Sequence, residues 1–366
     1  MKRVAVVGVG MMGRNHVRVY SEMPEVELVG IVDQNPAVAG PLSHTYHIPL
    51  YTDVREMVEK ARPDAVTVAV PTEFHHEAAK ALLEMGCNVL VEKPIAATLE
   101  EACELRDLAN RLGLVLTVGH IERFNPAIME LKRRLESGEL GRVFQMHARR
   151  VGPFPTRIQD VGVIKDLAIH DLDIMQYLSG NFVDRVYAEA KSTLHQRGED
   201  MFIGTLHFAD NTIGLLEINW LTPTKIRELY VTGDRGMFQV NYITQDLRFF
   251  ENADYGQSEW SSLSLLRGVS EGSIIQYAVK KKEPLRSELE TFIGHLEGKA
   301  NRIVSPADAI SALRVALALS ESARVSQIIT VNSHEGYRIP TASGEKPRLP
   351  ESAGRLSAQL GAQASD

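Results

Sequence analysis

The sequence predicts an α/β fold: an N-terminal doubly wound parallel sheet, followed by an α/β domain with a large, open, mostly antiparallel sheet. Two observations predict this division. Through about residue 120, short and continuously apolar segments alternate with helical patterns, which is typical of a parallel sheet covered on both faces. Beyond Phe124 the strand-like segments are longer and alternate apolar with polar residues, as in a sheet with one open face.

The first part of the chain consists of alternating strands and helices. Predicted strands cover Arg3–Val7, Glu27–Val32, Asp64–Val70, Asn88–Val91 and Leu114–Val118. Predicted helices cover Met12–Glu22, His75–Met85 and Leu99–Arg111, and a glycine follows soon after each of the last two. Parallel strands need crossover connections, which are right-handed. This order therefore gives a doubly wound domain, expected over residues 1–121.

The second part, expected over residues 122–332, combines helices with alternating strands. Its predicted strands are Arg142–Arg150, Arg185–Lys191, Met201–Phe208, Thr212–Trp220, Glu228–Thr232 and Gly236–Val240. Helices are expected over Ala127–Leu135 and Pro306–Ser326, and Ser305 is suited to cap the latter. We expect the helix at 306–326 to pack back on the first domain. Residues 333–366 are expected to form a C-terminal extension.

Composition narrows the class of protein. The 366 residues are 44 % hydrophobic, which fits a globular chain of two domains and excludes a disordered one. The net charge of −7 argues against nucleic-acid binding, and no apolar run is long enough for a membrane helix. The two cysteines, Cys87 and Cys103, form no CxxC pair. This excludes a disulfide scaffold and a cysteine zinc site, and it favours a cytoplasmic protein.

A glycine-rich turn predicts a dinucleotide site. Gly8, Gly10 and Gly13 follow a predicted strand and open a predicted helix, with Met11 and Met12 between them. In a Rossmann domain the first glycine allows the tight turn, and the second lets the backbone approach the pyrophosphate at the helix N-terminus. The third allows the helix to pack closely on the strand.

Asp33 decides the choice of cofactor. It closes the next strand, where its carboxylate can accept hydrogen bonds from the hydroxyls of the adenosine ribose. The same carboxylate would repel the 2′-phosphate of NADP, and Gln34 brings no compensating positive charge. NAD is therefore the expected cofactor. The alternative is that Asp33 merely starts a turn with Asn35 and Pro36.

Further cofactor-binding residues are expected where the later strands end, because ligands of a doubly wound sheet bind at the carboxyl edge of its strands. The candidates at this edge are Pro71, Thr72, His75, Glu92, Lys93 and His120. His75 lies just inside the next helix, where it either packs under the cofactor or only serves the helix start.

Lys93, within Glu92-Lys93-Pro94, is the first catalytic candidate. A lysine at the end of a buried strand, next to a positively charged nicotinamide ring, loses its proton more easily than a solvated one. The sequence leaves open whether Lys93 acts as a base or as a hydrogen-bond donor to a substrate oxygen.

A second cluster of polar residues follows later in the chain. If Leu167–Leu178 is helical, then Asp166, His170 and Asp173 lie on one face of the helix. An imidazole with a carboxylate one turn away is a suitable proton acceptor. The alternatives are a purely structural polar face and a metal site, and the latter is disfavoured because the cluster has one histidine and no cysteine. No metal is expected.

Together these residues resemble the Gfo/Idh/MocA oxidoreductases. The resemblance covers about residues 1–330 and is carried by the glycine turn, Val70-Pro71-Thr72 with His75, Glu92-Lys93-Pro94 and Asp166-x-x-x-His170. It implies a Rossmann domain plus an α/β domain whose open sheet makes oligomer contacts, here in a homodimer or homotetramer. It also implies that Lys93, Asp166 and His170 are catalytic and that the Lys93–Pro94 bond is cis.

A narrower resemblance, to UDP-N-acetylglucosamine 3-dehydrogenases, is carried by residues 119–126, 148–155 and 162–166. It implies that a UDP-sugar is oxidised at its 3-hydroxyl to a ketone, which a partner aminotransferase converts to an amine for lipid A or other surface glycans. A diphosphate needs cations, and Arg149, Arg150 and Arg157 are candidates. The sugar itself is expected at the three catalytic residues.

The preferred mechanism uses His170 as the base, oriented by Asp166, with Lys93 stabilising the developing alkoxide. Two alternatives to this function stay open. A dehydrogenase of inositol or of a free hexose on the same scaffold would bind no diphosphate and would not need the arginines. A dinucleotide-binding regulator without turnover is the other, but the joint presence of the three catalytic candidates argues against it.

Overall fold

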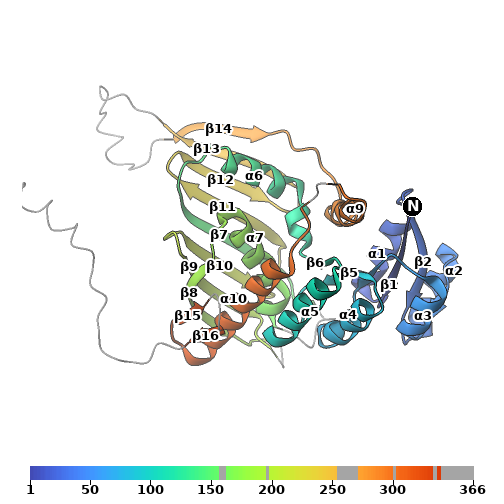
Figure 1. The fold of residues 1–366 in the computed structure, drawn as a ribbon. Coiled ribbons are helices and arrows are strands. Elements are labelled where there is room, and N and C mark those ends of the chain that lie inside the picture. The colour runs from blue at the N-terminus through green and yellow to red at the C-terminus, as the bar shows by residue number, and fades with distance from the viewer. Residues whose placement is uncertain (156–161, 195–197, 254–270, 300–301, 333–335, 339–366) are drawn as a thin grey trace, which may run out of the picture.

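The computed structural model describes residues 1–155, 162–194, 198–253, 271–299, 302–332 and 336–338 (Figure 1). Its N-terminal part contains a parallel sheet of six strands in the order β3-β2-β1-β4-β5-β6. The strands are β1 (Lys2–Val7), β2 (Val26–Val32), β3 (Leu50–Tyr51), β4 (Ala65–Val68), β5 (Asn88–Glu92) and β6 (Leu116–Gly119).

Helices cover both faces of this sheet, because successive residues of a strand point to opposite sides. Val4 and Val6 of β1 belong to one buried core, and Ala5 and Val7 belong to the other. The first core includes residues of α1 (Met11–Ser21), α2 (Pro36–Tyr46) and α9 (Pro284–Leu296), and the second includes residues of α3 (Val54–Ala61), α4 (His75–Glu84) and α5 (Leu99–Leu112). The doubly wound sheet expected from the sequence is confirmed.

The second sheet has ten described strands in the order β14-β13-β12-β11-β7-β10-β9-β8-β15-β16. Among these pairs only β7 and β10 run parallel, so the expected mostly antiparallel sheet is also confirmed. The strands are β7 (Val143–Val151), β8 (Val183–Lys191), β9 (Met201–Phe208), β10 (Ile213–Asn219), β11 (Ile226–Gly233), β12 (Gly236–Asn241), β13 (Asp246–Asn252), β14 (Glu271–Tyr277), β15 (Ile329–Asn332) and β16 (Gly336–Arg338).

Three helices, α6 (Pro126–Glu136), α7 (Ile169–Ser179) and α10 (Pro306–Val325), lie against one face of this sheet (Figure 1). The longest of them, α10, also reaches the first sheet. Its Ile310 and Leu313 are buried in the core that contains α4 and α5, whereas Val315 and Leu319 are buried in the core of the second sheet. Apolar packing along a single helix therefore joins the two sheets.

Several elements were not expected from the sequence, namely α2, α3, α9, β3 and the strands from β13 onward. The second helix buries one residue, Ala39, and α3 has 8 residues, so neither carries a long apolar period. The helix α9 does carry such a signal. Leu285, Leu289, Phe292 and Ile293 share its buried face, and Pro284 stands at its first position.

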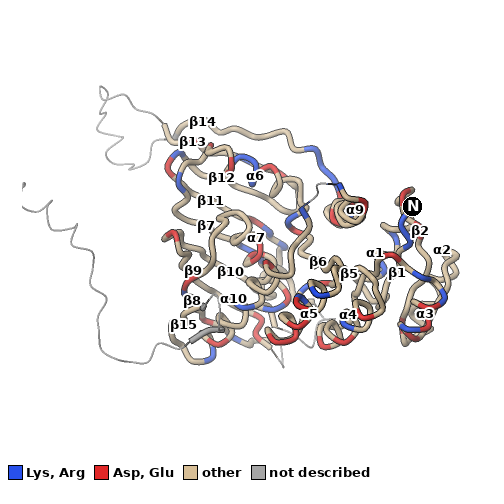
Figure 2. Tube along the Cα trace, viewed as in Figure 1, with Lys and Arg blue, Asp and Glu red and all other residues tan. Residues whose placement is uncertain are grey.

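The surface of the described chain mixes charges of both signs. Figure 2 shows acidic and basic residues interspersed along α3, α4 and α5. Within the described ranges no helix combines the length and apolar character that crossing a membrane requires.

Candidate active site

The glycine turn lies between the end of β1 and the start of α1. Gly8 has a φ of +83°, and a Cβ there would lie 2.7 Å from the carbonyl oxygen of Ala69. A Cβ on Gly13 would lie 1.8 Å from the carbonyl oxygen of Gly8. Around a Cβ on Gly10, in contrast, no atom lies within 4 Å. The fold therefore requires the first and third glycines, and the second leaves space for a ligand.

The N-terminus of α1 fits the pyrophosphate of a dinucleotide. No side chain caps this helix, and its first turn contains no acidic residue. The first N–H groups of a helix have no partner inside it, and here Met11, Met12 and Gly13 carry them. Such a helix end attracts anions through these groups and through the helix dipole.

Asp33 lies beside the same turn. Its Oδ2 accepts a hydrogen bond of 2.9 Å from the N–H of Val9, and its Oδ1 accepts one of 2.8 Å from the N–H of Asn35. The contact with Asn35 is the one expected if Asp33 starts a turn. The contact with Val9 directs the carboxylate to the glycine turn. The two roles are therefore compatible, and binding of the ribose by Asp33 stays a prediction.

A buried contact between a carboxylate and an imidazole supports the end of β5. Oε1 of Glu92 accepts a hydrogen bond of 2.7 Å from Nε2 of His16, which is fully buried in α1. Burial opposes the charged form of Glu92, but the hydrogen bond and the nearby charges of His16 and Lys93 outweigh it and lower the pKa of Glu92. The neighbouring Lys93–Pro94 peptide bond is cis, as expected.

His75 connects two loops beneath this edge of the sheet. It is 1 % exposed, its Nδ1 lies 2.7 Å from the carbonyl oxygen of Pro94, and its Nε2 lies 2.9 Å from that of Val70. Burial lowers the pKa of His75, although both carbonyl contacts favour the protonated ring. Both ring nitrogens are occupied by backbone. His75 therefore positions the residues around Pro94 and offers no nitrogen to the cofactor, and its packing under the cofactor stays a prediction.

The remaining residues of this edge keep their predicted places. Pro71 and Thr72 follow β4, and Thr72 begins the short 3₁₀ helix η1 (Thr72–Phe74) that leads into α4. His120 follows β6. The ends of β1, β4, β5 and β6, which are neighbours in the sheet, thus bring the cofactor candidates to one edge.

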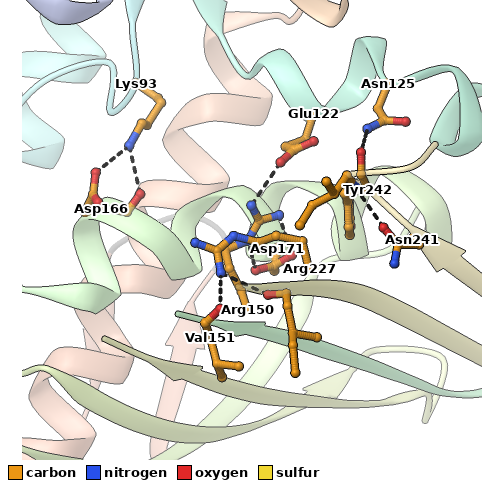
Figure 3. Close-up of polar contacts among 12 residues, drawn as sticks. Lys93, Glu122, Asn125, Arg150, Val151, Asp166, Asp171, Arg227, Asn241 and Tyr242 are labelled. Atoms are coloured by element: carbon orange, nitrogen blue, oxygen red, sulfur yellow. Dashed lines mark hydrogen bonds and ion pairs between the residues drawn. The ribbon is translucent and has the colours of Figure 1, made fainter. Parts of the chain in front are cut away.

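Lys93 and Asp166 join this edge to the second part of the chain (Figure 3). Nζ of Lys93 donates to the carbonyl oxygen of Asp166 at 2.8 Å and to its Oδ1 at 3.0 Å. The two side chains are 17 % and 22 % exposed, so the pair is partly shielded and still accessible to a substrate. Asp166 lies in a π-helical turn, η3 (Ile164–Ala168), which directly precedes α7.

The π-helical turn changes the predicted geometry around His170. A π turn holds more residues than an α turn, so residues four apart no longer stand in line. Asp166 bonds Lys93, and no hydrogen bond between described residues links it to His170. The prediction that Asp166 orients His170 is therefore wrong for this structure. Nδ1 of His170 is instead buried without a partner.

His170 is surrounded by positive charge. Burial, and after it the charges of Lys93, Arg150 and other cations, lowers the pKa of His170 well below its usual range. The imidazole is therefore neutral at physiological pH. A neutral imidazole with an unpartnered nitrogen is able to accept a proton.

Asp173 is bonded to partners other than Asp166 and His170. Nε and Nη2 of Arg123 donate to its two carboxylate oxygens at 2.7 and 2.6 Å. Its Oδ2 also lies 3.8 Å from Nδ1 of His120, a buried side chain whose ring nitrogens have no hydrogen-bond partner. His170 and Asp173 are three residues apart in α7 and therefore share a face of that helix, whereas the π-helical turn moves Asp166 out of line with them, so the predicted common face holds only in part.

The three arginines predicted to bind a diphosphate are not together. Arg149 and Arg150 are neighbours in β7, so their side chains leave opposite faces of the sheet. Nε of Arg149 pairs with Glu217 of β10 at 3.0 Å, on the face opposite to α7. Arg149 is therefore remote from Lys93, and the prediction that it binds substrate is wrong. Arg157 lies outside the described residues.

Arg150 is buried in a network of its own (Figure 3). Its Nε and Nη2 lie 2.6 and 3.0 Å from the carboxylate of Asp171, and its Nη1 lies 2.9 Å from Glu122. Burial opposes the charged form, but the two carboxylates outweigh it and hold the pKa of Arg150 well above its usual range. Because its charge is already balanced, Arg150 is a structural residue and its predicted role in binding diphosphate is corrected.

Sequence reasoning missed His16 and Arg227. His16 is a polar residue at a buried position of α1, a signal that the amphipathic pattern of the helix contains. Arg227 lies in β11, in line with the buried Leu229 and Val231, so the alternation of that strand directs it to the inner face of the sheet. Both could have been found by asking which polar residues interrupt an apolar face.

Within the ranges that the structure describes, no group of three or more histidine, cysteine, aspartate or glutamate side chains is arranged to hold a metal ion.

Two family models match the chain. Residues 2–120 match the Gfo/Idh/MocA oxidoreductase family with its NAD-binding Rossmann fold, and residues 128–239 match the Gfo/Idh/MocA C-terminal domain. The first match assigns NAD to the N-terminal residues and confirms the expected cofactor.

Several dehydrogenases are similar to the chain in sequence or structure over most of its length. UDP-N-acetylglucosamine 3-dehydrogenase of Acidithiobacillus ferrooxidans is 27 % identical over 80 % of this chain and 87 % of its own length. Its solved structure covers 88 % of this chain and 98 % of its own, at 24 % identity, with a TM-score of 0.79. Myo-inositol dehydrogenase Hyg17 of Streptomyces leeuwenhoekii is 32 % identical over 64 % of this chain and 74 % of its own length.

A further solved structure is similar in fold. The WlbA dehydrogenase from Bordetella pertussis, in complex with NADH and UDP-GlcNAcA, covers 90 % of this chain and 99 % of its own, at 21 % identity, with a TM-score of 0.74.

Proposed function

Because this chain belongs to the Gfo/Idh/MocA oxidoreductase family and resembles dehydrogenases that act on CH–OH groups, we propose that it oxidises the 3-hydroxyl of UDP-N-acetylglucosamine with NAD. The observation that carries the proposal is the Lys93–Asp166 pair, which meets a neutral His170 at the carboxyl edge of the NAD-binding sheet. The resemblance to UDP-N-acetylglucosamine 3-dehydrogenase over 80 % of the chain supports the choice of substrate.

In the proposed mechanism NAD, when bound, accepts the hydride from C3 of the sugar. Gly10 and the first N–H groups of α1 would hold the pyrophosphate, and Asp33 would hold the ribose. A dinucleotide held in this way would present its nicotinamide to the edge at which Lys93 lies.

The protein's own residues manage the proton and the charge. Neutral His170 accepts the hydroxyl proton on Nε2, since Nδ1 is buried and Nε2 is not among the buried nitrogens without a partner. The ammonium of Lys93, fixed by the two oxygens of Asp166, donates a hydrogen bond to the sugar oxygen while negative charge develops on it. His120, buried with both ring nitrogens free of hydrogen bonds within the described chain, is a further candidate to contact the sugar or the nicotinamide.

The second candidate function is oxidation of a free cyclitol such as inositol. It is favoured by the 32 % identity to a myo-inositol dehydrogenase. Such a substrate carries no diphosphate, so the two functions differ in whether the UDP group is required.

The test is NADH absorbance on mixing the purified protein and NAD with UDP-N-acetylglucosamine. A matched aminotransferase and glutamate, the proposed partner step, remove the ketone and pull the reaction forward. Sustained NADH formation that requires the UDP group supports the proposal. Turnover of myo-inositol and none of the UDP-sugar would replace it with the second candidate.

A Lys93→Ala variant tests the assignment of the site. We expect it to bind NAD normally and to lose at least about 100-fold in kcat, since Lys93 serves the reacting oxygen. Fluorescence titration with NAD checks the first expectation, and the NADH assay checks the second. Unchanged turnover would remove Lys93 from the mechanism.

A further inference from the structure

One guanidinium of the second sheet is fixed in place and open to a ligand. Arg227 of β11 is the register neighbour of Arg150 in β7, and Figure 3 shows their guanidinium groups next to each other. Nη1 of Arg227 donates to the carbonyl oxygens of Val151 at 2.7 Å and Ile226 at 2.9 Å. Backbone carbonyls therefore hold this cation where β7 ends.

No carboxylate among the described residues is paired directly with Arg227. Arg150 beside it has two carboxylate partners, whereas no ion pair between described residues involves Arg227. Its Nε and Nη2 donate to no described residue, and they are not among the buried unpartnered atoms, so they reach solvent. Burial, and after it the charge of Arg150, lowers the pKa of Arg227 to about 10. The side chain thus stays charged at neutral pH, with carboxylates nearby but none paired with it.

Arg227 lies within electrostatic range of the catalytic candidates. Its charge is one of those that lower the pKa of His170, and the carboxylate of Asp166 acts on Arg227 in the opposite direction. Lys93, the partner of Asp166, is on the same side of the sheet. An anion bound to Arg227 would therefore lie beside a sugar held by Lys93 and His170.

We propose that Arg227 binds the diphosphate of the substrate and thereby selects sugars that are linked to a nucleoside diphosphate. This inference rests on the proposed function and names the residue that carries its specificity. A guanidinium is planar and can donate two parallel hydrogen bonds to phosphate oxygens. Arg150 donates its hydrogen bonds to Asp171 and Glu122, and Arg149 lies on the other face of the sheet. Arg227 has both the free donors and the correct face.

The test compares Arg227→Gln and Arg227→Lys with Arg248→Gln, an exposed arginine of β13 in the same sheet. For each protein the KM for UDP-N-acetylglucosamine, the inhibition constant of UDP and the Kd for NAD are measured at pH 8. The first two constants are expected to rise together by roughly 10- to 100-fold in R227Q, which is the effect of losing hydrogen bonds to a charged group. The lysine keeps the charge without the planar fork, so R227K should lie between wild type and R227Q.

The control readouts separate binding from folding. An unchanged Kd for NAD in R227Q shows that the protein is folded, and kcat should change little because the diphosphate is bound alike in the ground and transition states. R248Q should match the wild type in all three constants. Inhibition by UDP that R227Q and R227K leave unchanged would overturn the inference.

The inference and the proposed function fail in different ways. Wild-type turnover of UDP-N-acetylglucosamine with the same KM in R227Q and R248Q would overturn the role of Arg227 alone. A wild-type protein that binds NAD but neither oxidises the UDP-sugar nor binds UDP would overturn both.

Discussion

His170 is the residue whose surroundings say most about the chemistry. Burial and the charges of Lys93, Arg150, His120 and Arg227 all lower its pKa. A pKa below the usual 6.5 means that the ring is still unprotonated, and able to act as a base, at pH values where a solvated histidine is charged.

The pH dependence of sugar oxidation follows from this direction. If His170 is the base, we expect the acidic limb of the kcat/KM profile to lie below pH 6.5, because protonation of the free enzyme is delayed. Arg227→Gln removes one of the cations, so it should move the limb to higher pH. Initial rates from pH 5 to 9 measure both. A limb above 6.5 that R227Q leaves in place would speak against His170.

The surroundings of Glu288 lead to a prediction about the stability of the protein and not about catalysis. It is 3 % exposed in α9, and both of its carboxyl oxygens lack a hydrogen-bond partner. Burial, and after it the charges of Glu92 and Asp173, raises the pKa of Glu288 well above its usual range. The folded protein therefore prefers the protonated acid.

The sign of the effect can be worked out. With a folded pKa above the unfolded value, the stabilisation is complete below about pH 4.3 and is lost as the pH rises through the folded pKa. Each unit of difference corresponds to about 1.4 kcal/mol. Glu288→Gln cannot titrate, so its melting temperature relative to wild type should rise between pH 5 and pH 8. A difference that stays constant over that range contradicts the prediction.

At the scale of elements, the glycine turn and α1 offer a matched pair of substitutions. A Cβ on Gly13 overlaps the carbonyl oxygen of Gly8, whereas a Cβ on Gly10 meets nothing within 4 Å. Gly13→Ala should therefore cost on the order of 1–3 kcal/mol of stability or more, as overpacking does. The free energy of unfolding of Gly10→Ala should lie within about 0.5 kcal/mol of the wild-type value.

Gly10→Ala, which leaves stability almost unchanged, should instead weaken NAD binding. The methyl group of Gly10→Ala fills the space left for the pyrophosphate, so NAD affinity should fall at least about tenfold with stability retained. Thermal unfolding and NAD titration measure the two effects. Normal NAD binding by G10A would place the pyrophosphate elsewhere.

The elements that the sequence predicts well are those whose apolar period is long or continuous. The strand β9 has the predicted bounds Met201–Phe208, since its residues alternate between core and surface. The helix α2 escapes this reasoning, because it buries little and contains Pro41. The strand β14 pairs with β13 and exposes Ile274 and Ile275, so its apolar residues mark no core face.

The site residues that lie at the ends of strands could be predicted from the sequence. Those whose role depends on partners distant in the chain could not. The glycine turn, Asp33 and Lys93 follow directly from strand ends at one edge of a parallel sheet. The partner of Asp166 depends on a π-helical turn, which no spacing in the sequence predicts. The roles of the arginines depend on which face of the sheet each leaves and on carboxylates distant in the chain, such as Asp171 and Glu122.

At the scale of the whole molecule, the two sheets meet through polar as well as apolar contacts. The short helix η2 (Ile121–Phe124) follows the last strand of the first sheet, and its Glu122 and Arg123 reach into the second part of the chain. Nη1 of Arg123 also lies 3.0 Å from Asp308 of α10. These contacts fix the NAD edge relative to α7. The homodimer or homotetramer expected through the open sheet stays a prediction.

The buried network around Arg150 tests this view of the molecule. Arg150 belongs to β7, Glu122 to η2 and Asp171 to α7, directly after His170. Removing one partner of a buried ion pair leaves an unbalanced charge and typically costs about 3–5 kcal/mol. Asp171→Ala should therefore lose about that much stability, measured by urea unfolding.

A control variant shows how much stability is lost when an exposed ion pair, and not a buried one, is broken. Glu217→Gln breaks the exposed pair with Arg149 on the open face, and such a pair contributes roughly 0–1 kcal/mol. If D171A loses no more stability than E217Q, the network does not hold the parts together. If the view is right, replacing Arg150, Asp171 and Glu122 together by apolar residues should recover stability, since no charge of the network is then left unpaired. It should not recover kcat, because η2 and α7 would no longer be tied in the geometry that brings His170 to Lys93.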